Sequence, residues 1–142
     1  MAKQLNVFLE NKPGRLAAVL GVLAKSEISV RAITIQDRGD FGIVRCLADM
    51  PEKAQILLSE GGFACALKDV LAVVVDDRPG GLQSLAAALQ AHGINVLDGY
   101  GFVVESSRLA VFCLEVDFPR RIQDILAKEG FRILEDQELY TL

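Results

Sequence analysis

The sequence has few of the residues that enzymes most often use for chemistry. It contains one histidine, His92, and three cysteines among 142 residues. General acid–base catalysis usually relies on histidine or on a carboxyl group with a shifted pKa. His92 precedes Gly93 at an expected helix end, where a capping role is typical. No Ser-His-Asp or Cys-His set can be assembled around it, so the sequence predicts a protein that is not an enzyme.

Motifs for metals, nucleotides and disulfides are also missing. The odd number of cysteines argues against a disulfide framework, and Cys46, Cys65 and Cys113 form no CxxC pair. No P-loop or dinucleotide-binding fingerprint occurs. Cys46 and Cys113 fall at what look like matching points of a repeat, inside apolar strands, which favours the role of small core residues. We therefore expect no metal site and no cofactor.

Long apolar runs and strong basic charge are absent as well. No apolar run reaches the roughly 18 residues of a membrane span. The first residues, Met1-Ala2-Lys3-Gln4, lack the apolar core of a signal peptide. The formal net charge is -4, whereas nucleic-acid-binding proteins usually carry a basic surface. These features predict a cytoplasmic protein that binds neither nucleic acid nor membrane.

The sequence does contain an internal repeat. An apolar strand pattern is followed by Asn-Lys-Pro-Gly-Arg-Leu at 11–16, and the same punctuation returns as Asp-Arg-Pro-Gly-Gly-Leu at 77–82. The two prolines, Pro13 and Pro79, stand 66 positions apart. Each proline can occupy the first helical position, because its missing N–H has no partner there in any case. The repeat predicts two domains, residues 1–68 and 69–142.

Both halves show the same order of elements. In the first half we expect a strand over 5–9, a helix from Pro13 to the polar residues 25–27, strands over 28–36 and 41–48, a helix from Pro51 to Gly61, and a strand over 63–67. In the second half we expect a strand over 70–75, a helix from Pro79 to Gly93, strands over 95–104 and 109–116, a helix from Pro119 to Gly130, and a strand starting at 131–134.

This order, βαββαβ, predicts a ferredoxin-like fold of the α+β class, with antiparallel strands and both helices on one face. A half of about 70 residues is marginal on its own, so the halves should pack on each other or on a second chain. Edge strands with free N–H and C=O groups invite pairing. We therefore expect the sheets to join edge to edge, within the chain or between chains, and the protein to form a homodimer.

A βαββαβ unit with a Pro-Gly corner after its first strand resembles an ACT domain. The resemblance rests on residues 11–16 with Ile28-Ser29-Val30, and on 77–82 with Gly93-Ile94-Asn95-Val96. It covers nearly the whole chain as two tandem copies, similar to the small stand-alone tandem-ACT proteins of bacteria and archaea. Such a resemblance implies a regulatory, allosteric role. ACT domains bind small effectors, mostly amino acids, between the corner of one domain and the second strand of its neighbour.

The resemblance also assigns candidate ligand contacts by position. The corner contacts are Asn11, Pro13, Gly14, Arg15 and Leu16 in the first copy, and Asp77, Pro79, Gly80, Gly81 and Leu82 in the second. The strand contacts are Ser29 and Val30, and Asn95 and Val96. The first copy departs from the pattern, because Ser29 stands where the second copy has Asn95, and Arg15 stands where it has Gly81.

The corner has chemistry that suits a free amino acid. A helix start offers unpaired N–H groups to a carboxylate, and the associated charge effect is worth about 0.3–1 kcal/mol. Gly14, Gly80 and Gly81 let a ligand approach the backbone, while Asn11 and Asp77 could bind an ammonium group or cap the helix. The same residues are also good turn formers, so a purely structural interpretation stays open.

Two functional hypotheses follow. The first is a non-catalytic sensor that binds a small amino acid and controls a separate metabolic enzyme. The alternative is a regulatory or scaffolding subunit without a ligand of its own, resembling the small subunit of acetolactate synthase. Tyr100, between Gly99 and Gly101, indicates that another backbone, a ligand or an interface approaches this strand closely.

Overall fold

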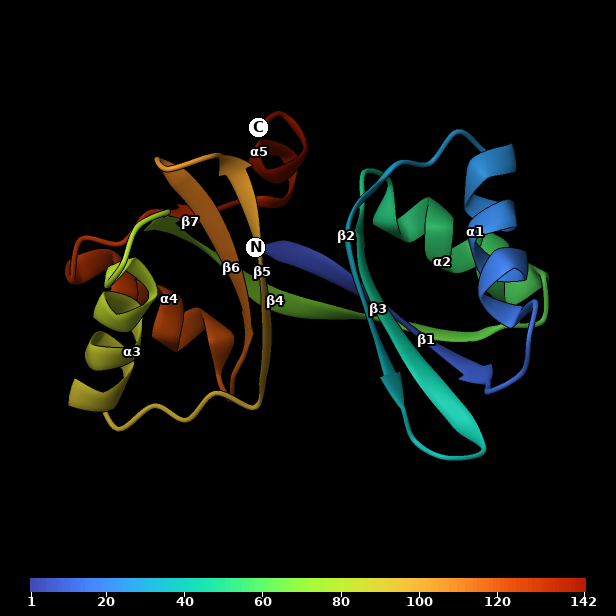
Figure 1. The fold of residues 1–142 in the computed structure, drawn as a ribbon, viewed down its shortest axis with the longest axis horizontal. Helices are drawn as coiled ribbons and strands as arrows, with labels where there is room; N and C mark the ends of the chain where they lie inside the picture. Colours follow the sequence, from blue (N-terminus) through green and yellow to red (C-terminus); the bar gives the residue numbers. More distant parts are fainter. The chain divides into compact units, whose positions relative to one another are not determined.

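The structure is a computed structural model that describes residues 1–142. The chain forms two compact units. One contains Lys3–Lys68, and the other contains Asp69–Leu142 together with Met1–Ala2 (Figure 1). Each unit has its own apolar core.

The first unit is built from β1 (Ala2–Glu10), α1 (Arg15–Lys25), β2 (Val30–Asp37), β3 (Phe41–Ala48), α2 (Pro51–Glu60) and the beginning of β4 (Ala64–Asp76). The strand order is β2-β3-β1-β4, and β3 runs antiparallel to both β1 and β2. Helices α1 and α2 lie together on one side of this sheet (Figure 1). The expected ferredoxin-like α+β fold is confirmed here.

The second unit repeats this plan with the rest of β4, α3 (Gly81–Ala91), β5 (Asp98–Glu105), β6 (Leu109–Glu115), α4 (Pro119–Lys128), β7 (Ile133–Leu134) and α5 (Asp136–Tyr140). Strand β6 runs antiparallel to β4 and β5, and β7 pairs with the other side of β4. Helices α3 and α4 lie on the same side of the sheet (Figure 1). None of the helices in either unit is long and apolar enough to cross a membrane.

Several element boundaries differ from the sequence predictions. The expected strands 63–67 and 70–75 form a single strand, β4, because Lys68-Asp69 between them contains no glycine or proline to end it. The strand expected from Asn95 begins only at Asp98. Helix α5 was not predicted, and a capping box between Glu135 and Glu138 closes its start.

The two cores are related by the repeat. In the first unit Val19 and Leu23 of α1 pack against Leu5 and Val7 of β1, and α2 adds Leu58. In the second unit the matching positions carry Leu85, Leu89, Leu71 and Val73, and α4 adds Leu126. Full burial of one such side chain stabilises a fold by about 1.5–3 kcal/mol. The helical spacing seen in the sequence therefore reflects the packed face of each helix.

The buried cysteines do not occupy matching positions. Cys46 pairs in register with Leu5 on the core side of its sheet. Cys113 pairs with Ala72, between the core residues Leu71 and Val73, so it faces the opposite side. The expected match was wrong because the second hairpin is longer, which shifts β6 relative to the repeat. Burial raises the pKa of Cys46 to about 11 and the pKa of Cys113 to about 12.

Thiol reactivity should therefore separate the three cysteines. At pH 8 about one buried thiol in a thousand or fewer is ionised, so Cys46 and Cys113 should react with Ellman's reagent only on unfolding. Cys65 is only half-buried, and its Sγ lies 3.3 Å from Ser59 Oγ, so it should react first. Absorbance at 412 nm measures the rates, and Cys65→Ser should remove the fast phase. Three equal rates in the native protein would contradict this assignment.

The glycines beside Tyr100 make room for an aromatic ring of the same unit. A Cβ atom added to Gly99 would lie 3.0 Å from Phe112 Cε1, and one added to Gly101 would lie 3.1 Å from Phe112 Cδ2. Phe112 is the register partner of Gly101. In the first unit the matching layer is Ile33, Val44 and Ile35, with Val44 opposite Ile35. Each unit thus fills this layer in its own way. The first has large residues on β2 and a smaller one on β3, whereas the second has glycines on β5 and a large residue on β6.

This complementarity predicts coupling between positions 101 and 112. Gly101→Ala should destabilise the fold by roughly 1–3 kcal/mol, because the new methyl group overpacks the Phe112 ring. In a Phe112→Val background, which copies Val44, the same change should have a much smaller effect. Urea denaturation of the two single variants and the double variant gives the coupling energy. If the losses of stability in the two single variants simply add in the double variant, Gly101 does not serve to make room for the Phe112 ring.

Candidate functional site

The first strand-to-helix corner is closed by three backbone hydrogen bonds. The Asn11 amide donates to Asp40 O at 3.0 Å, which ties the corner to the β2–β3 hairpin. The Lys12 amide donates to Glu10 O at 2.9 Å, and the Arg15 amide donates to Lys12 O at 3.3 Å. The chain therefore reverses direction within five residues before α1 begins.

The second corner repeats these bonds, with the corner residues shifted by 66 positions and the hairpin acceptor shifted by 68, from Asp40 to Arg108. The Asp77 amide donates to Arg108 O at 3.3 Å, at the β5–β6 hairpin. The Arg78 amide donates to Asp76 O at 3.0 Å, and the Gly81 amide donates to Arg78 O at 3.0 Å. The repeated sequence pattern therefore corresponds to one repeated backbone structure.

Left-handed glycines stand at the centre of both corners. Gly14 has φ 87° and Gly80 has φ 88°, and each is the residue before the helix. A left-handed residue cannot continue into a right-handed helix, so α1 begins at Arg15 and α3 at Gly81. The prediction that Pro13 and Pro79 are the first helical residues was therefore wrong. Neither helix start has a side-chain cap, which leaves backbone amides open to a ligand.

The polar residue that opens each corner binds the neighbouring hairpin. Asn11 Nδ2 donates to Asp37 Oδ1 at 3.1 Å and to Gly39 O at 3.0 Å. Asp77 Oδ2 accepts a hydrogen bond from the Ser107 amide at 2.7 Å. Neither side chain caps its helix. The Asn11 side-chain nitrogen is therefore already used in two hydrogen bonds. Asp77 uses only Oδ2, so its Oδ1 is available to a ligand.

The two corners differ most at positions 15 and 81. The Arg15 guanidinium lies over the Phe63 ring, 5.0 Å from its centroid, and so packs against its own unit. A Cβ atom at Gly81 would lie 2.0 Å from Asp76 O. The second corner is folded so closely on itself that only glycine fits there. Leu16, the last predicted contact of the first corner, packs partly buried against the first core.

A hollow of about 700 Å³ opens beside the second corner. We call it the corner hollow. Three predicted contacts, Asp77, Pro79 and Leu82, line it from one side. Leu82 is 48% exposed, although it belongs to the same helix as the buried Leu85 and Leu89. The other lining residues are Val75, Asp76, Arg78, Gly101, Phe102, Val103, Ser107, Ala110, Val111 and Phe112.

Sequence reasoning missed the far wall of this hollow. It is made by Val103 on β5 and Phe112 on β6, which share the core-facing side of the sheet. The glycines of β5 indicated that another group lies close to this strand, but the sequence pattern did not show that this group is the Phe112 ring. At the rim, Arg78 pairs with Asp76 at 2.9 Å.

The predicted strand contacts lie away from the corners of their own units. Asn95 and Val96 line a hollow of about 460 Å³ at the C-terminal end of α3. The 11 residues of α3 separate them from the second corner by about 16 Å. In the first unit the Ser29 amide donates to Asp49 Oδ1 at 3.0 Å, and Val30 packs against the core. Within a unit, therefore, corner and strand contacts do not meet.

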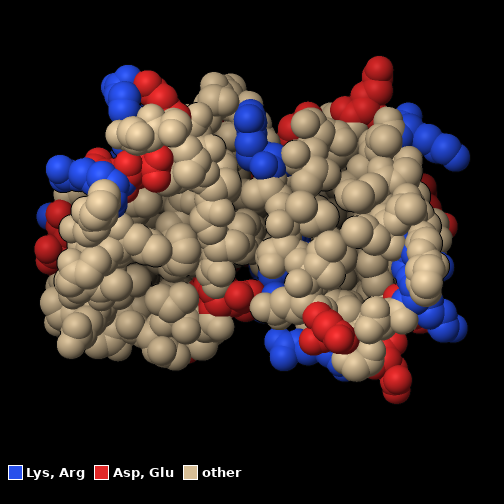
Figure 2. Space-filling model, in the orientation of Figure 1, with Lys and Arg blue, Asp and Glu red and all other residues tan.

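Charged side chains of both signs occur on one face of the molecule. On the face shown in Figure 2, acidic and basic side chains are interspersed among uncharged ones. No group of three or more His, Cys, Asp or Glu residues is placed to hold a metal ion.

Known proteins share this architecture. A family model for an ACT domain pair matches residues 1–142. The crystal structure of protein BT0572 from Bacteroides thetaiotaomicron is 33% identical with a TM-score of 0.92, covering 99% of this chain and 96% of that one. The ligand-free regulatory subunit of aspartate kinase from Thermus thermophilus shares the fold at 16% identity and a TM-score of 0.64, covering 89% and 91%.

A structure of the aspartokinase alpha and beta subunits also shares the fold, at 20% identity and a TM-score of 0.61, covering 89% of this chain and 90% of that one. Among curated proteins no match is found. The family match spans both corners and both sheets, and it agrees with the repeated backbone of the two corners. This chain belongs to the ACT domain family, as an ACT domain pair over residues 1–142.

Proposed function

We propose that this chain is a non-catalytic regulatory protein that binds a small amino acid beside its strand-to-helix corners. Residues 1–68 and 69–142 would be its two ACT domains. The corner hollow is the observation that carries this proposal. It combines open backbone amides, a carboxylate and an apolar wall within about 700 Å³, which is in the usual range for small-molecule sites.

Each part of a free amino acid has a partner in this hollow. The uncapped start of α3 offers the N–H groups of Gly80 and Leu82 to the ligand carboxylate, while the Gly81 N–H is bonded to Arg78 O and lets the ligand approach by having no side chain. Asp77 has one oxygen on the Ser107 amide and the other available for an ammonium group. An aliphatic side chain would lie against Leu82, Val103 and Phe112, where its burial supplies affinity that the helix charge alone does not.

The remaining contacts would come from another domain. Asn95 and Val96 stand at the far end of α3 from their own corner, so a complete site of the ACT type needs the strand of a neighbour. This supports a homodimer. The first corner, with Asn11, Pro13, Gly14, Arg15 and Leu16 and its strand contacts Ser29 and Val30, would be the weaker site. Its Asn11 amide and Arg15 guanidinium are already engaged within the unit.

The proposed role is allosteric control of a separate enzyme of amino-acid metabolism, in the cytoplasm. The regulatory subunit of aspartate kinase from Thermus thermophilus shows that a chain with this fold can act as a regulatory subunit. The alternative, a regulatory or scaffolding subunit without a ligand, differs in a measurable way. Only the sensor should change its association with a partner enzyme when the amino acid is added.

The proposal predicts ligand stabilisation that depends on Leu82. At a hundredfold excess over Kd, a bound amino acid should add about 2.7 kcal/mol to the free energy of unfolding and raise the melting temperature by several degrees. Leu82→Asp should remove this shift, because its charge repels the ligand carboxylate and removes apolar contact. Leu82 is exposed and near a helix start, so an acidic residue is tolerated there.

Differential scanning fluorimetry with the twenty amino acids, followed by calorimetry on each hit, measures this effect. Ile56→Asp is the matched control, since Ile56 is a similarly exposed residue of α2, at 58%, away from the corners. If no amino acid raises the melting temperature at millimolar concentration, the sensor hypothesis fails and the ligand-free subunit becomes the better account. An unchanged shift in Leu82→Asp would place the ligand elsewhere.

A further inference from the structure

The repeat places an arginine side chain in the first unit where the second unit has a pocket. Arg15 and Gly81 stand at matching positions, 66 residues apart, as the first residues of α1 and α3. Phe63 and Phe131 also match, because each follows a left-handed glycine after the second helix of its unit. The two units can therefore be compared as a filled and an open version of one place in the fold.

In the first unit Arg15 covers the ring of Phe63. Its guanidinium lies 5.0 Å from the ring centroid, within the range of a cation–π contact, and Phe63 is only 8% exposed. The same charge acts on Glu10, the last residue of β1. The pKa of Glu10 is lowered by its hydrogen bond and ion pair with Lys12, and further by the charge of Arg15. The first unit thus holds a guanidinium over an aromatic ring and near a carboxylate.

The second unit has a pocket of about 310 Å³ at the matching place. We call it the Phe131 pocket. Phe131 and Asp76, the last residue of β4, line it and match the ring and the carboxylate of the first unit. Phe131 packs against the second core but is only partly buried. Gly81 lines the pocket at the arginine position, and the other lining residues are Val74, Val75, Ser84, Gly130 and Arg132.

The second unit does not supply the missing cation itself. A Cβ atom at Gly81 would lie 2.0 Å from Asp76 O, so this position cannot carry an arginine side chain. The one cation that lines the pocket, Arg132, is paired with α5, because its Nη2 donates to Glu138 Oε1 at 3.3 Å. Glu138 is itself held by the Glu135 amide at 2.9 Å. The Phe131 ring is therefore open to a cation from outside the unit.

The polar groups beside the ring are able to receive such a cation. Asp76 Oδ2 lies 2.9 Å from Arg78 Nη2. The first unit has the same pair, with Glu10 at 2.8 Å from Lys12, and accommodates a guanidinium as well. Ser84 donates its hydroxyl proton to a backbone carbonyl at 3.0 Å, so its oxygen keeps the capacity to accept a hydrogen bond.

We propose that the Phe131 pocket receives the guanidinium group of an arginine side chain from another protein. The guanidinium stacks on the Phe131 ring, and its N–H groups bind the Asp76 carboxylate. The contact reproduces between two chains what Arg15 and Phe63 form within one unit. The proposal does not depend on a ligand in the corner hollow.

A protein partner suits this pocket better than a dissolved guanidine does. One cation–π contact strengthens binding by about 2- to 30-fold, and an exposed ion pair adds little more. A Kd of 1 mM requires about a thousandfold preference relative to the 1 M standard state. The pocket therefore serves as one anchor among the many contacts of a protein interface, where arginine is enriched.

A short blocked peptide tests the site by NMR. In ¹⁵N–¹H spectra of the full chain at constant ionic strength, acetyl-Gly-Arg-Gly-amide at up to about 200 mM should progressively shift the amide signals of Gly130 and Phe131. The same peptide with uncharged citrulline in place of arginine should shift them at least about threefold less. Absence of any arginine-dependent shift overturns the proposal. Binding of ethylguanidine below about 1 mM also overturns it, since the pocket would then be a small-molecule site.

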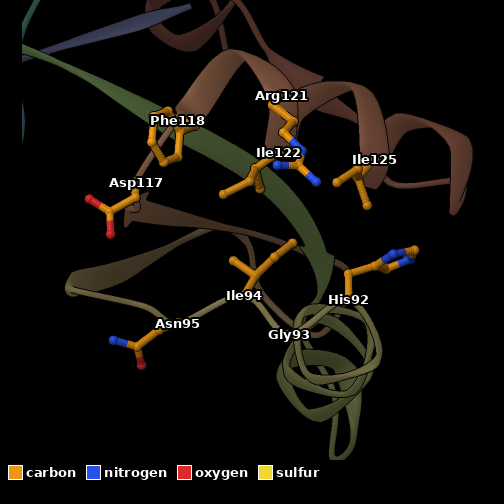
Figure 3. A pocket seen from close by; sticks show the side chains of 9 residues that line it. All are labelled: His92, Gly93, Ile94, Asn95, Asp117, Phe118, Arg121, Ile122 and Ile125. Atoms are coloured by element: carbon orange, nitrogen blue, oxygen red, sulfur yellow. The ribbon is translucent and has the colours of Figure 1, made fainter.

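The first unit and a second pocket supply the controls. The signals of Phe63 should not move in the natural chain, but they should move in Arg15→Ala, which uncovers the ring. The pocket between the end of α3 and the start of α4 contains the Arg121 guanidinium, which extends between Ile122 and Ile125 (Figure 3). Because this charge repels a second guanidinium, the imidazole signals of His92, which lines that pocket, should stay in place. A His92 response as large as that of Phe131 would mean unspecific binding and overturn the proposal.

Variants identify the groups that bind. Phe131→Leu keeps an apolar side chain but removes the ring face, so it should reduce the Gly130 response at least about threefold. Phe63→Leu, the matched change in the first unit, should leave that response unchanged. A response that persists in Phe131→Leu overturns the proposal, and if this variant does not fold, the exposed Asp76→Asn decides in the same way. Leu82→Asp should have no effect, so a failure here is distinct from a failure of the corner hollow.

Discussion

The left-handed glycine at each corner is the constraint on which the rest of both units depends. Gly14 and Gly80 have φ values of 87° and 88°, a conformation that costs most other residues about 1–2 kcal/mol. This single turn stops the strand, starts the helix one residue later and fixes the helix across the sheet. It also explains why no side chain caps either helix: the residue in the capping position has none. The open amides proposed to hold a carboxylate are thus a direct consequence of how the fold is made.

Much of the fold follows from the sequence because the two patterns that specify it are local. The helical spacing of Val19 and Leu23, repeated as Leu85 and Leu89, marks the packed faces, and proline marks where α2 and α4 begin. What escaped prediction depends on pairing across the sheet. Whether Lys68-Asp69 ends a strand, and whether Cys113 faces the core, is decided by register with residues far away in the chain. A hairpin that is longer in the second repeat changes that register without leaving a local signal.

The candidate sites, too, are only partly predictable from local sequence. The Pro-Gly pairs were enough to locate the corners, but they did not show which corner side chains are already hydrogen-bonded. Asn11 is occupied because the β2–β3 hairpin brings Asp37 and Gly39 to it, a contact between segments far apart in the sequence. The wall of the corner hollow depends on Phe112 leaning over two glycines of the next strand. Matching polar residues can be bonded in one repeat and free in the other although the sequences around them are similar. Only the packed structure therefore distinguishes the two cases.

The differences between the repeats are more informative than their likeness, because the fold does not require them. The same architecture accommodates Ile33 and Ile35 or Gly99 and Gly101, and it accommodates a bonded Asp49 or an unbonded Asp117. At the first of these places Phe112 fills the space above the two glycines, and at the second the acidic side chain is bonded in the first unit and exposed to solvent in the second. Asp117 is exposed, so water hydrates its carboxylate and the missing hydrogen bond costs the fold little. The corner hollow, which has its walls in the second unit, is therefore the feature for which ligand binding is proposed there.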